Sequence, residues 1–515
     1  MPQPQTHAPL NAERAWRWAL ILAAGLTVLR LVVLFLGSLE LYPDEAQYWL
    51  WSRALHWGYV SKPPMIAWLI GATTVFSDSE GWVRLAAPLL HAGAMLALFR
   101  VGLRLYGPAV ALLAAALWGL MPGVQISALF IATDAPMLAF LALSLWAYVA
   151  LRQAEAGRAR LILAAGLGAA MGLALLSKWA ALFMLIGMAL HAVLDREARR
   201  AWGGWAWAAA LGALLVVLAP NLIWQASHGF ATLHHTTAVN ASWKASSPVH
   251  PGLLLKFLLN QLGVFGPIPL GVLIAGAVLY LRRKALAGPD LLLACLALPA
   301  LALVSVQALI AHATAHWAAA SYVAASVLVA AWLVRWRAKG WTIAALAIQG
   351  LAAAVILLAI GAPSVVDAVG LSRRLERQRG WAETASVAAG VARGEAAHGG
   401  LTAVATEDRY VFNELAYYGR SYFEAPGAPP LTMRPAAQAL NEAELSSPLT
   451  GALGSRALIV EWADRTKAAA LPGDFTQVQP LGRWSITTGP RRARQIDLAV
   501  GIDWRGPVSG RPTPP

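Results

Sequence analysis

The chain has 515 residues, of which 58% are hydrophobic and only 13% are charged, and its mean hydropathy is +0.57. The apolar residues come in blocks of about 20, the length of a membrane-spanning helix, so an ordinary soluble domain is excluded and a polytopic α-helical membrane protein is indicated. The net charge of +14 does not indicate nucleic acid as a partner, because the arginines form short clusters between apolar spans, where membrane orientation explains them. The single cysteine, Cys295, excludes a disulfide framework.

Apolar windows along the chain predict about eleven transmembrane helices. Their approximate spans are 16–37, 82–104, 109–130, 134–151, 161–177, 179–194, 202–224, 262–281, 290–310, 317–334 and 341–361. The first span is too long for the core of a signal peptide and no small-residue cleavage site follows it, so we expect it to remain as an anchor.

The distribution of basic residues predicts the orientation in the membrane. If the amino terminus is cytoplasmic, every second connection holds a basic cluster, and these clusters include Arg14 and Arg17, Arg196, Arg199 and Arg200, and Arg335, Arg337 and Lys339. The opposite connections hold only Arg53, Lys62, Lys178, Lys244 and Lys256. The positive-inside rule therefore places the 38–81 loop and the carboxyl terminus outside the cytoplasm.

The composition changes after about Ala362, where charges become frequent and long apolar runs stop. Short β-type segments at 401–406 and 457–462 alternate with a helix-like segment at 408–418. We therefore predict a transmembrane domain over 1–361, a soluble α/β domain on the outer face over 362–503, and a disordered tail over 504–515, which is rich in Pro, Gly and Arg.

The loop between the first two predicted spans carries an acidic pair and a lysine, Asp44, Glu45 and Lys62. Charges near a bilayer are costly to hold, so these three residues are candidates for function. An aspartate before a helical segment is also a common N-cap. The loop alone does not decide whether Asp44 is a general base or an N-cap. We interpret the tryptophans of this region as an interfacial aromatic belt rather than a platform for sugar. They are Trp49, Trp51, Trp57 and Trp68.

Further polar residues are predicted on the same outer side. Arg84 lies at the start of the second span, Asp134 opens the fourth, Lys178 joins the fifth and sixth, and His228 lies in the 225–261 loop. Each has an ordinary alternative: snorkelling for Arg84 and Lys178, an N-cap for Asp134, and an interfacial contact for the histidine. Because no His-Glu-x-x-His or paired-cysteine spacing occurs, we expect no metal or other cofactor.

Carboxylates and several cations facing outward at a membrane suit a lipid-phosphate substrate. The cations would neutralise a phosphate leaving group while a carboxylate accepts a proton from an incoming hydroxyl. A transporter or flippase would instead place charges near the bilayer midplane on paired broken helices. A glycan polymerase or ligase with a lipid-linked donor is a second alternative.

These motifs resemble the bacterial GT-C membrane glycosyltransferases, in the branch of the protein O-mannosyltransferases and the aminoarabinose transferase that modifies lipid A. The resemblance spans roughly residues 16–360. It is carried by Asp44-Glu45-Ala-Gln-Tyr-Trp-Leu-Trp, Gly58-Tyr59, Lys62-Pro-Pro, Arg84, Thr133-Asp134-Ala-Pro, Leu176-Ser-Lys178 and Pro220-Asn-Leu-Ile-Trp with His228-Gly.

The resemblance implies an inverting transferase of the bacterial inner membrane that uses a polyprenyl-phosphate sugar. Its catalytic domain would be the transmembrane domain over 1–361, and its active site and the 362–503 α/β domain would be periplasmic. Asp44 would be the base, Lys62 and Lys178 would hold the donor phosphate, and Asp134 would support the cavity, with Arg84 as a further phosphate candidate. The complete set of expected site residues is, for catalysis, Asp44, Glu45 and Asp134, and, for substrate or phosphate binding, Lys62, Arg84, Lys178, Tyr59, Gln47 and His228.

Two positions depart from the lipid A transferase. It has arginine where this chain has Gln47, and glutamate where this chain has Ser61. The metal associated with that glutamate is therefore not carried over. The expected partners are a polyprenyl (undecaprenyl) phosphate sugar, membrane lipids, and an acceptor that is lipid A, lipopolysaccharide or another envelope glycan. Protein O-glycosylation within the same family and a lipid-linked glycan transporter or polymerase are the alternatives.

Overall fold

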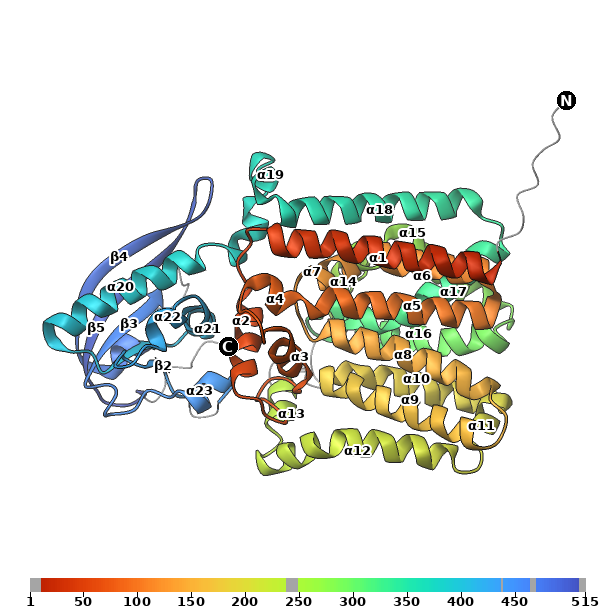
Figure 1. Ribbon diagram of the computed structural model, residues 1–515, viewed down its shortest axis with the longest axis horizontal. Helices are drawn as coiled ribbons and strands as arrows, with labels where there is room; N and C mark the ends of the chain where they lie inside the picture. The colour runs from red at the N-terminus through yellow and green to blue at the C-terminus, as the bar shows by residue number, and fades with distance from the viewer. Residues whose placement is uncertain (1–10, 238–248, 437–438, 464–468, 509–515) are drawn as a thin grey trace. The chain divides into compact units, whose positions relative to one another are not determined.

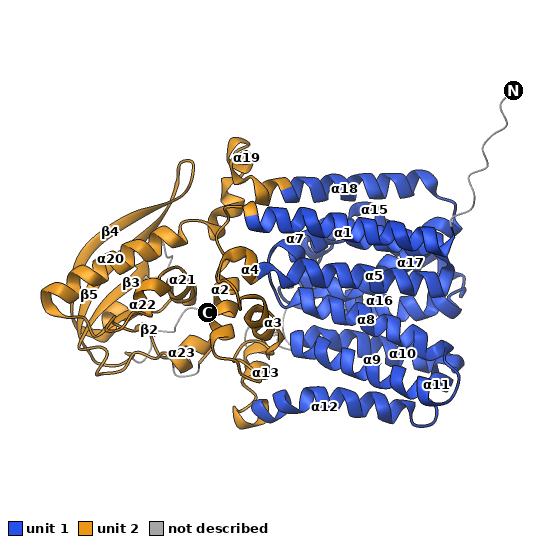
Figure 2. Ribbon diagram, viewed as in Figure 1, with its two compact units in different colours: residues 1–35, 84–224, 241–357 blue, residues 36–83, 225–240, 358–515 orange. Residues whose placement is uncertain are grey.

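The computed structural model describes residues 11–237, 249–436, 439–463 and 469–508. The chain divides into two compact units. Unit 1 contains residues 1–35, 84–224 and 241–357, and unit 2 contains residues 36–83, 225–240 and 358–515 (Figure 2). Each unit is described separately below.

Unit 1 is helical, and its long apolar helices run side by side (Figure 1). Their bounds are α1 Ala12–Leu36, α5 Ala86–Tyr106, α6 Pro108–Leu120, α7 Pro122–Leu129, α8 Asp134–Gln153, α9 Arg158–Ser177, α10 Leu182–Leu194, α12 Ala206–Ser227, α14 Pro251–Val264, α15 Pro267–Arg282, α16 Gly288–Ile310, α17 Ala319–Arg335 and α18 Lys339–Gly361. The shorter elements are η1 Trp179–Ala181, α11 Arg196–Ala201 and η3 Ala315–Ala318.

Eight helices of the described chain are long and apolar enough to cross a membrane, or up to ten spans if each of two bent pairs counts as one. The prediction of a polytopic α-helical membrane protein is confirmed. The eight helices, the two bent pairs and the shorter apolar helix at 179–194 each fall on one of the predicted spans. The sequence missed α14, which begins inside the predicted 225–261 loop, ends at Val264 and meets α15 at an angle of 118°.

Small residues let the helices of unit 1 approach closely. A Cβ atom at Gly276 of α15 would lie 2.1 Å from the ring of Trp332 on α17, so only glycine fits there. The indole of Trp332 donates a hydrogen bond to the carboxylate of Asp290, which also pairs with Arg335 at 2.6 Å. The carboxylate is therefore neutralised and hydrogen-bonded, as a charge on a helix within a membrane requires.

Unit 2 combines short helices with a mixed sheet. The helices are α2 Pro43–Arg53, α3 Met65–Thr73, α4 Glu80–Arg84, α13 Ala231–His235, α19 Pro363–Ala368, η4 Ser372–Gln378, α20 Trp381–Gly399, α21 Arg409–Tyr418, α22 Arg420–Phe423, α23 Glu442–Ser446 and η5 Leu471–Asp474, with the last residue of α4 in unit 1. The strands are β1 Ala403–Thr406, β2 Leu431–Met433, β3 Arg456–Trp462, β4 Phe475–Gly489 and β5 Arg492–Trp504. The predicted carboxyl-terminal α/β domain is confirmed.

The strand order is β2-β1-β3-β5-β4, with β1 parallel to β2 and β3, and β5 antiparallel to β3 and β4. Val404 pairs with Leu431 on one side and Leu458 on the other. Because strand side chains alternate, Val404 and Leu458 face α20 and α21 while Ala403 and Ile459 join the core of the opposite face. The sheet is thus apolar on both faces.

The segment that was predicted as a loop of the transmembrane domain, 38–81, belongs to unit 2 with the sheet. The carboxylate of Glu40 accepts hydrogen bonds from the backbone N–H groups of Trp381 and Ala382, at 2.6 and 3.1 Å, where α20 begins. A carboxylate there satisfies N–H groups that lack helical partners. The backbone N–H of Leu41 donates to the hydroxyl of Tyr418 on α21.

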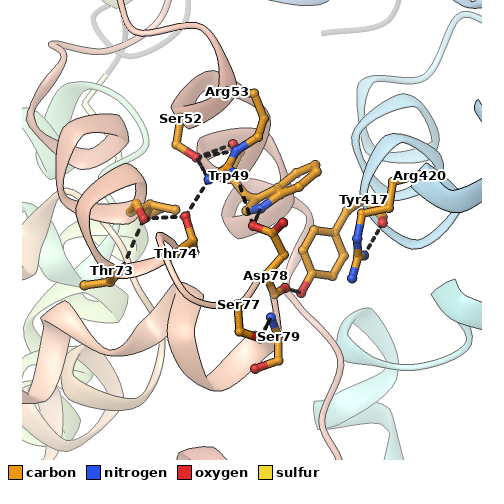
Figure 3. A network of polar contacts seen from close by, with 11 residues as sticks. Trp49, Ser52, Arg53, Thr73, Thr74, Ser77, Asp78, Ser79, Tyr417 and Arg420 are labelled. Atoms are coloured by element: carbon orange, nitrogen blue, oxygen red, sulfur yellow. Dashed lines mark hydrogen bonds and ion pairs between the residues drawn. The ribbon is translucent and has the colours of Figure 1, made fainter. Parts of the chain in front are cut away.

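A polar network fixes α2 to α21 around Asp78 (Figure 3). The carboxylate of Asp78 accepts a hydrogen bond from the indole of Trp49 at 2.8 Å and pairs with Arg53 at 3.2 Å, and its carbonyl accepts from the hydroxyl of Tyr417. Trp49 is 1% exposed and lies edge-on to Tyr417. Trp49 is therefore a buried anchor within unit 2.

The predicted aromatic belt is wrong for two of its four members. Trp51 is buried like Trp49, and it stacks on Tyr59 with ring centres 4.5 Å apart. Trp57 is 53% exposed and packs edge-on against Trp68, and the interpretation of these two as belt residues stays a prediction. The sequence shows aromatic residues at helical spacing, and only packing decides which of them face the inside of the unit.

Part of the predicted disordered tail is ordered. Strand β5 continues to Trp504, and the backbone N–H groups of Arg505 and Val508 donate hydrogen bonds to Asp474. Residues 509–515 of that tail lie outside the described residues.

Candidate active site

Helix α2 places Asp44 in its first turn, after Pro43. The carboxylate lies 3.5 Å from the guanidinium of Arg409, and its side chain keeps 39% exposure. The N-cap position belongs to Tyr42, so Asp44 is not the cap of this helix. Asp44 is therefore available for contact with a substrate, on an element that the Asp78 network holds in place.

Glu45 and Gln47 have different surroundings from Asp44, and both are buried. The Glu45 carboxylate accepts a hydrogen bond from the backbone N–H of Tyr42 at 2.9 Å, an arrangement that stabilises the start of α2. The amide oxygen of Gln47 lies 3.4 Å from Arg409. Of the two neighbouring carboxylates, the less buried Asp44 is thus better placed to meet a substrate.

Arg409 was not singled out in the sequence, and it is the main addition from the structure. It begins α21, in the segment that the sequence predicted as helical, and contacts Asp44, Gln47 and Tyr410. Arg377 lies in the same part of unit 2 and donates to the hydroxyl of Tyr42 at 2.8 Å. No local pattern relates these arginines to a loop so far away in sequence, so only the fold could identify them.

Arg409 connects Asp44 to His235 and Lys62, because the charges of Arg409 and Lys62 both act on the His235 imidazole. Burial, followed by the positive charges of Lys62 and Arg409, lowers the pKa of His235 to about 4. The imidazole is therefore neutral at neutral pH, and the cations around it belong to Lys62 and Arg409. Within unit 2, the fold thus gathers one carboxylate and several basic groups around α2 and α13.

Tyr59 has a structural position within the loop that follows α2. Its hydroxyl lies 3.0 Å from the carbonyl of Trp51 and accepts from the backbone N–H of His56, and burial raises the pKa of the hydroxyl to about 12. The Tyr59 carbonyl accepts a hydrogen bond from Thr232. These contacts orient the Tyr59 hydroxyl toward its own backbone, and its predicted contact with substrate stays a prediction.

His228 is exposed, and its imidazole lies 3.0 Å from the hydroxyl of Ser227. Its role in substrate binding also stays a prediction. In the described part of the chain, no group of three or more His, Cys, Asp or Glu side chains is arranged to hold a metal ion.

Unit 1 brings together two other predicted site residues. The ammonium of Lys178 donates to both carboxylate oxygens of Asp134, at 2.8 and 3.0 Å, and both side chains are less than one-fifth exposed. Asp134 opens α8, and Lys178 lies between α9 and η1. The snorkelling and cap alternatives do not describe this pair, because each residue has the other as a partner.

Arg84 is 2% exposed and places its guanidinium 5.3 Å from the centre of the Phe130 ring. A buried guanidinium over an aromatic face is stabilised by the ring quadrupole. Arg84 is thus packed within unit 1, and the snorkelling alternative is wrong for it.

Comparison with known proteins agrees with this architecture. Residues 61–224 match the family model described as dolichyl-phosphate-mannose-protein mannosyltransferase. The chain is 39% identical over 254 residues to the lipid A galacturonosyltransferase RgtD of Rhizobium johnstonii, a match that covers 49% of this chain and 52% of the relative. The chain thus spans about half the length of the curated relative it matches.

The structure resembles ArnT from Cupriavidus metallidurans along nearly the whole chain. Against the crystal structure with undecaprenyl phosphate, the TM-score is 0.66 at 17% identity, with coverage of 97% of this chain and 99% of ArnT. Against the apo crystal structure the TM-score is 0.63, also at 17% identity, with coverage of 94% and 98%. The chain therefore has a GT-C fold, and the predicted resemblance to ArnT-like membrane glycosyltransferases is confirmed.

Proposed function

We propose that the protein is an inverting glycosyltransferase of the bacterial inner membrane that moves a monosaccharide from a polyprenyl-phosphate donor to lipid A or a related envelope lipid. The observation that carries the proposal is the position of Asp44, a partly exposed carboxylate beside Arg409 in the cluster that includes Lys62. The similarity to RgtD, a lipid A galacturonosyltransferase by name, supports lipid A as acceptor and makes a hexuronic acid the first sugar to test. The ArnT structure with undecaprenyl phosphate supports the donor class.

In the proposed reaction the acceptor hydroxyl attacks the anomeric carbon of the donor sugar. A new carbon–oxygen bond forms, the bond from that carbon to the phosphate oxygen breaks, and the configuration inverts. Asp44 accepts the proton of the hydroxyl as general base. Polyprenyl phosphate leaves with the bonding electrons.

Basic groups near Asp44 would act on the leaving phosphate. Negative charge on the phosphate increases as the bond to the sugar breaks, so Lys62 and Arg409 would bind the transition state more tightly than the ground state. The roles predicted for Lys178 and Asp134 stay predictions. The cytoplasmic location of the amino terminus also stays a prediction.

The test is sugar transfer by the purified full chain in detergent. Wild type and Asp44→Asn each receive polyprenyl-phosphate monosaccharides, including a hexuronosyl donor, with lipid A as acceptor, and products are identified by mass spectrometry. We expect transfer by wild type and a loss of about 100-fold or more in Asp44→Asn, the usual contribution of a general base. Asp497→Asn is the matched control, because Asp497 is a carboxylate paired with an arginine on the sheet of the same unit.

Each other outcome contradicts part of the proposal. Near-normal transfer by Asp44→Asn would show that Asp44 is not the base. Transfer to a protein and not to lipid A would favour protein O-glycosylation. Failure of the wild type to bind or consume any donor, in protein that is folded and monodisperse, would favour a transporter.

A further inference from the structure

A second polar site lies in unit 1, between α14 and the segment that precedes α17. A cavity of about 210 Å³ is lined there by Lys256 and Asn260 on one side and by His312 and Thr314 on the other. Leu253 and Phe257 complete the α14 side of the lining. None of these residues belongs to the set predicted for the glycosyl-transfer site.

The spacing along α14 explains why these side chains converge. Leu253, Lys256, Phe257 and Asn260 follow the i, i+3, i+4, i+7 pattern, so they share one face of the helix. The opposite face carries exposed leucines, including Leu255 at 58% and Leu259 at 55%. An amphipathic helix with this distribution suits a position where an apolar membrane region meets a polar one.

The walls of the cavity are held in place by hydrogen bonds and packing contacts between the surrounding segments. The amide nitrogen of Gln261 donates to the carbonyl of Ala315 at 3.1 Å, and its amide oxygen accepts from the hydroxyl of Tyr322 at 2.6 Å. The backbone N–H of His250 donates to the carbonyl of Leu309 at 2.7 Å. Phe257 packs against Val304 and Ala308 of α16. The site is thus built on packed helices.

The polar side chains of the lining lack protein partners. The hydroxyl oxygen of Thr314 is buried and makes no hydrogen bond. Lys256, Asn260 and His312 are exposed, and they make no hydrogen bond or ion pair with any residue that the structure describes. Buried hydroxyl groups nearly always have partners, so the unpaired hydroxyl of Thr314, beside three exposed polar side chains at the same cavity, points to a ligand that enters from the exposed side.

The chemistry of the lining defines the class of that ligand. Among the described residues, the lining contains an ammonium, an imidazole, an amide and a hydroxyl, but no carboxylate. Such a set favours an anion with several acceptor oxygens, and the leucines on the other face of the same helix favour acyl chains nearby. We propose that this cavity binds the phosphate group of a membrane lipid. The proposal does not depend on the proposed glycosyl transfer.

The experiment measures lipid binding to the full chain in detergent by native mass spectrometry. The probe is dioctanoyl phosphatidic acid, and dioctanoyl glycerol, which has the same acyl chains without phosphate, is the control ligand. We expect binding of phosphatidic acid only, weakened about tenfold or more in Lys256→Ala and in His312→Ala, since a charge-assisted contact contributes at least that factor. Lys339→Ala, which removes an exposed lysine at the start of α18, should bind like wild type.

Three outcomes would overturn the proposal. Equal binding of dioctanoyl glycerol would exclude recognition of phosphate. Unchanged affinity in both Lys256→Ala and His312→Ala, each checked for monodisperse elution, would show that the phosphate binds elsewhere. Displacement of phosphatidic acid by inorganic phosphate at equal concentration would assign the site to free phosphate and not to a lipid.

Discussion

Replacing Arg409 by alanine separates catalytic from structural roles of the Asp44 cluster. The Arg409–Asp44 contact is 3.5 Å long, and both side chains are about one-third exposed. Two unit charges at that distance interact by about 1.2 kcal/mol in water, and solvent screening and side-chain entropy reduce the net value of such exposed pairs to below about 1 kcal/mol. The loss of Arg409 should therefore change the free energy of unfolding by less than about 1 kcal/mol.

The effect on turnover should be much larger. A hydrogen bond or ion pair from Arg409 to a phosphate that gains charge in the transition state is worth roughly 1.5–3 kcal/mol, which corresponds to a loss of about 10- to 150-fold. Because the contact strengthens as the bond breaks, the loss should be mainly in kcat and not in KM. Arg409→Lys should recover part of the rate, since the charge is kept while the planar guanidinium is lost.

The assay is steady-state sugar transfer with Arg409→Ala, Arg409→Lys and a control, combined with thermal unfolding of each protein. The control is Arg483→Ala, because Arg483 also pairs with an aspartate, Asp497, on the sheet of unit 2 and is more exposed. The reasoning would be refuted if Arg409→Ala kept normal kcat. It would also be refuted if the fall in activity matched a fall in the amount of folded protein.

Three further predictions concern other ionisable groups. The Lys178–Asp134 pair is short and mostly buried, so a double-mutant cycle with Lys178→Ala and Asp134→Asn should give a coupling energy of at least about 1 kcal/mol by thermal unfolding, whereas zero coupling would make the contact energetically irrelevant. Arg434 and Asp474 are a fully buried pair, so Arg434→Ala should destabilise unit 2 by roughly 3–5 kcal/mol, and a loss below 1 kcal/mol measured by denaturant unfolding would contradict this. The pKa of His235 is about 4 when folded and near 6.5 when unfolded, so the unfolded chain binds more protons between these values and stability should fall as the pH falls from about 6.5 to 4. His235→Gln should reduce that slope in pH-dependent melting, and an unchanged slope would show that His235 does not contribute.

The sequence by itself determined the class of protein and most of its helices. Long apolar blocks must become helices because the bilayer leaves backbone groups no other partner, so the spans could be located without tertiary information. The bent pair of α14 and α15 was harder to predict, since α14 is short and carries Lys256 and Asn260 among its leucines. Its amphipathic pattern did not reach the length of a span.

The candidate site was only partly accessible from the sequence. Asp44 and Lys62 were found because charged residues in a loop next to an apolar span are costly and therefore informative. Arg409 was not found, because its contact with Asp44 joins segments that are distant in sequence and carries no local signal. The same limit applies to Trp49, whose burial depends on Tyr417 and Asp78. Composition and periodicity therefore determined the class of protein and most of its helices, while long-range packing determined which side chains meet.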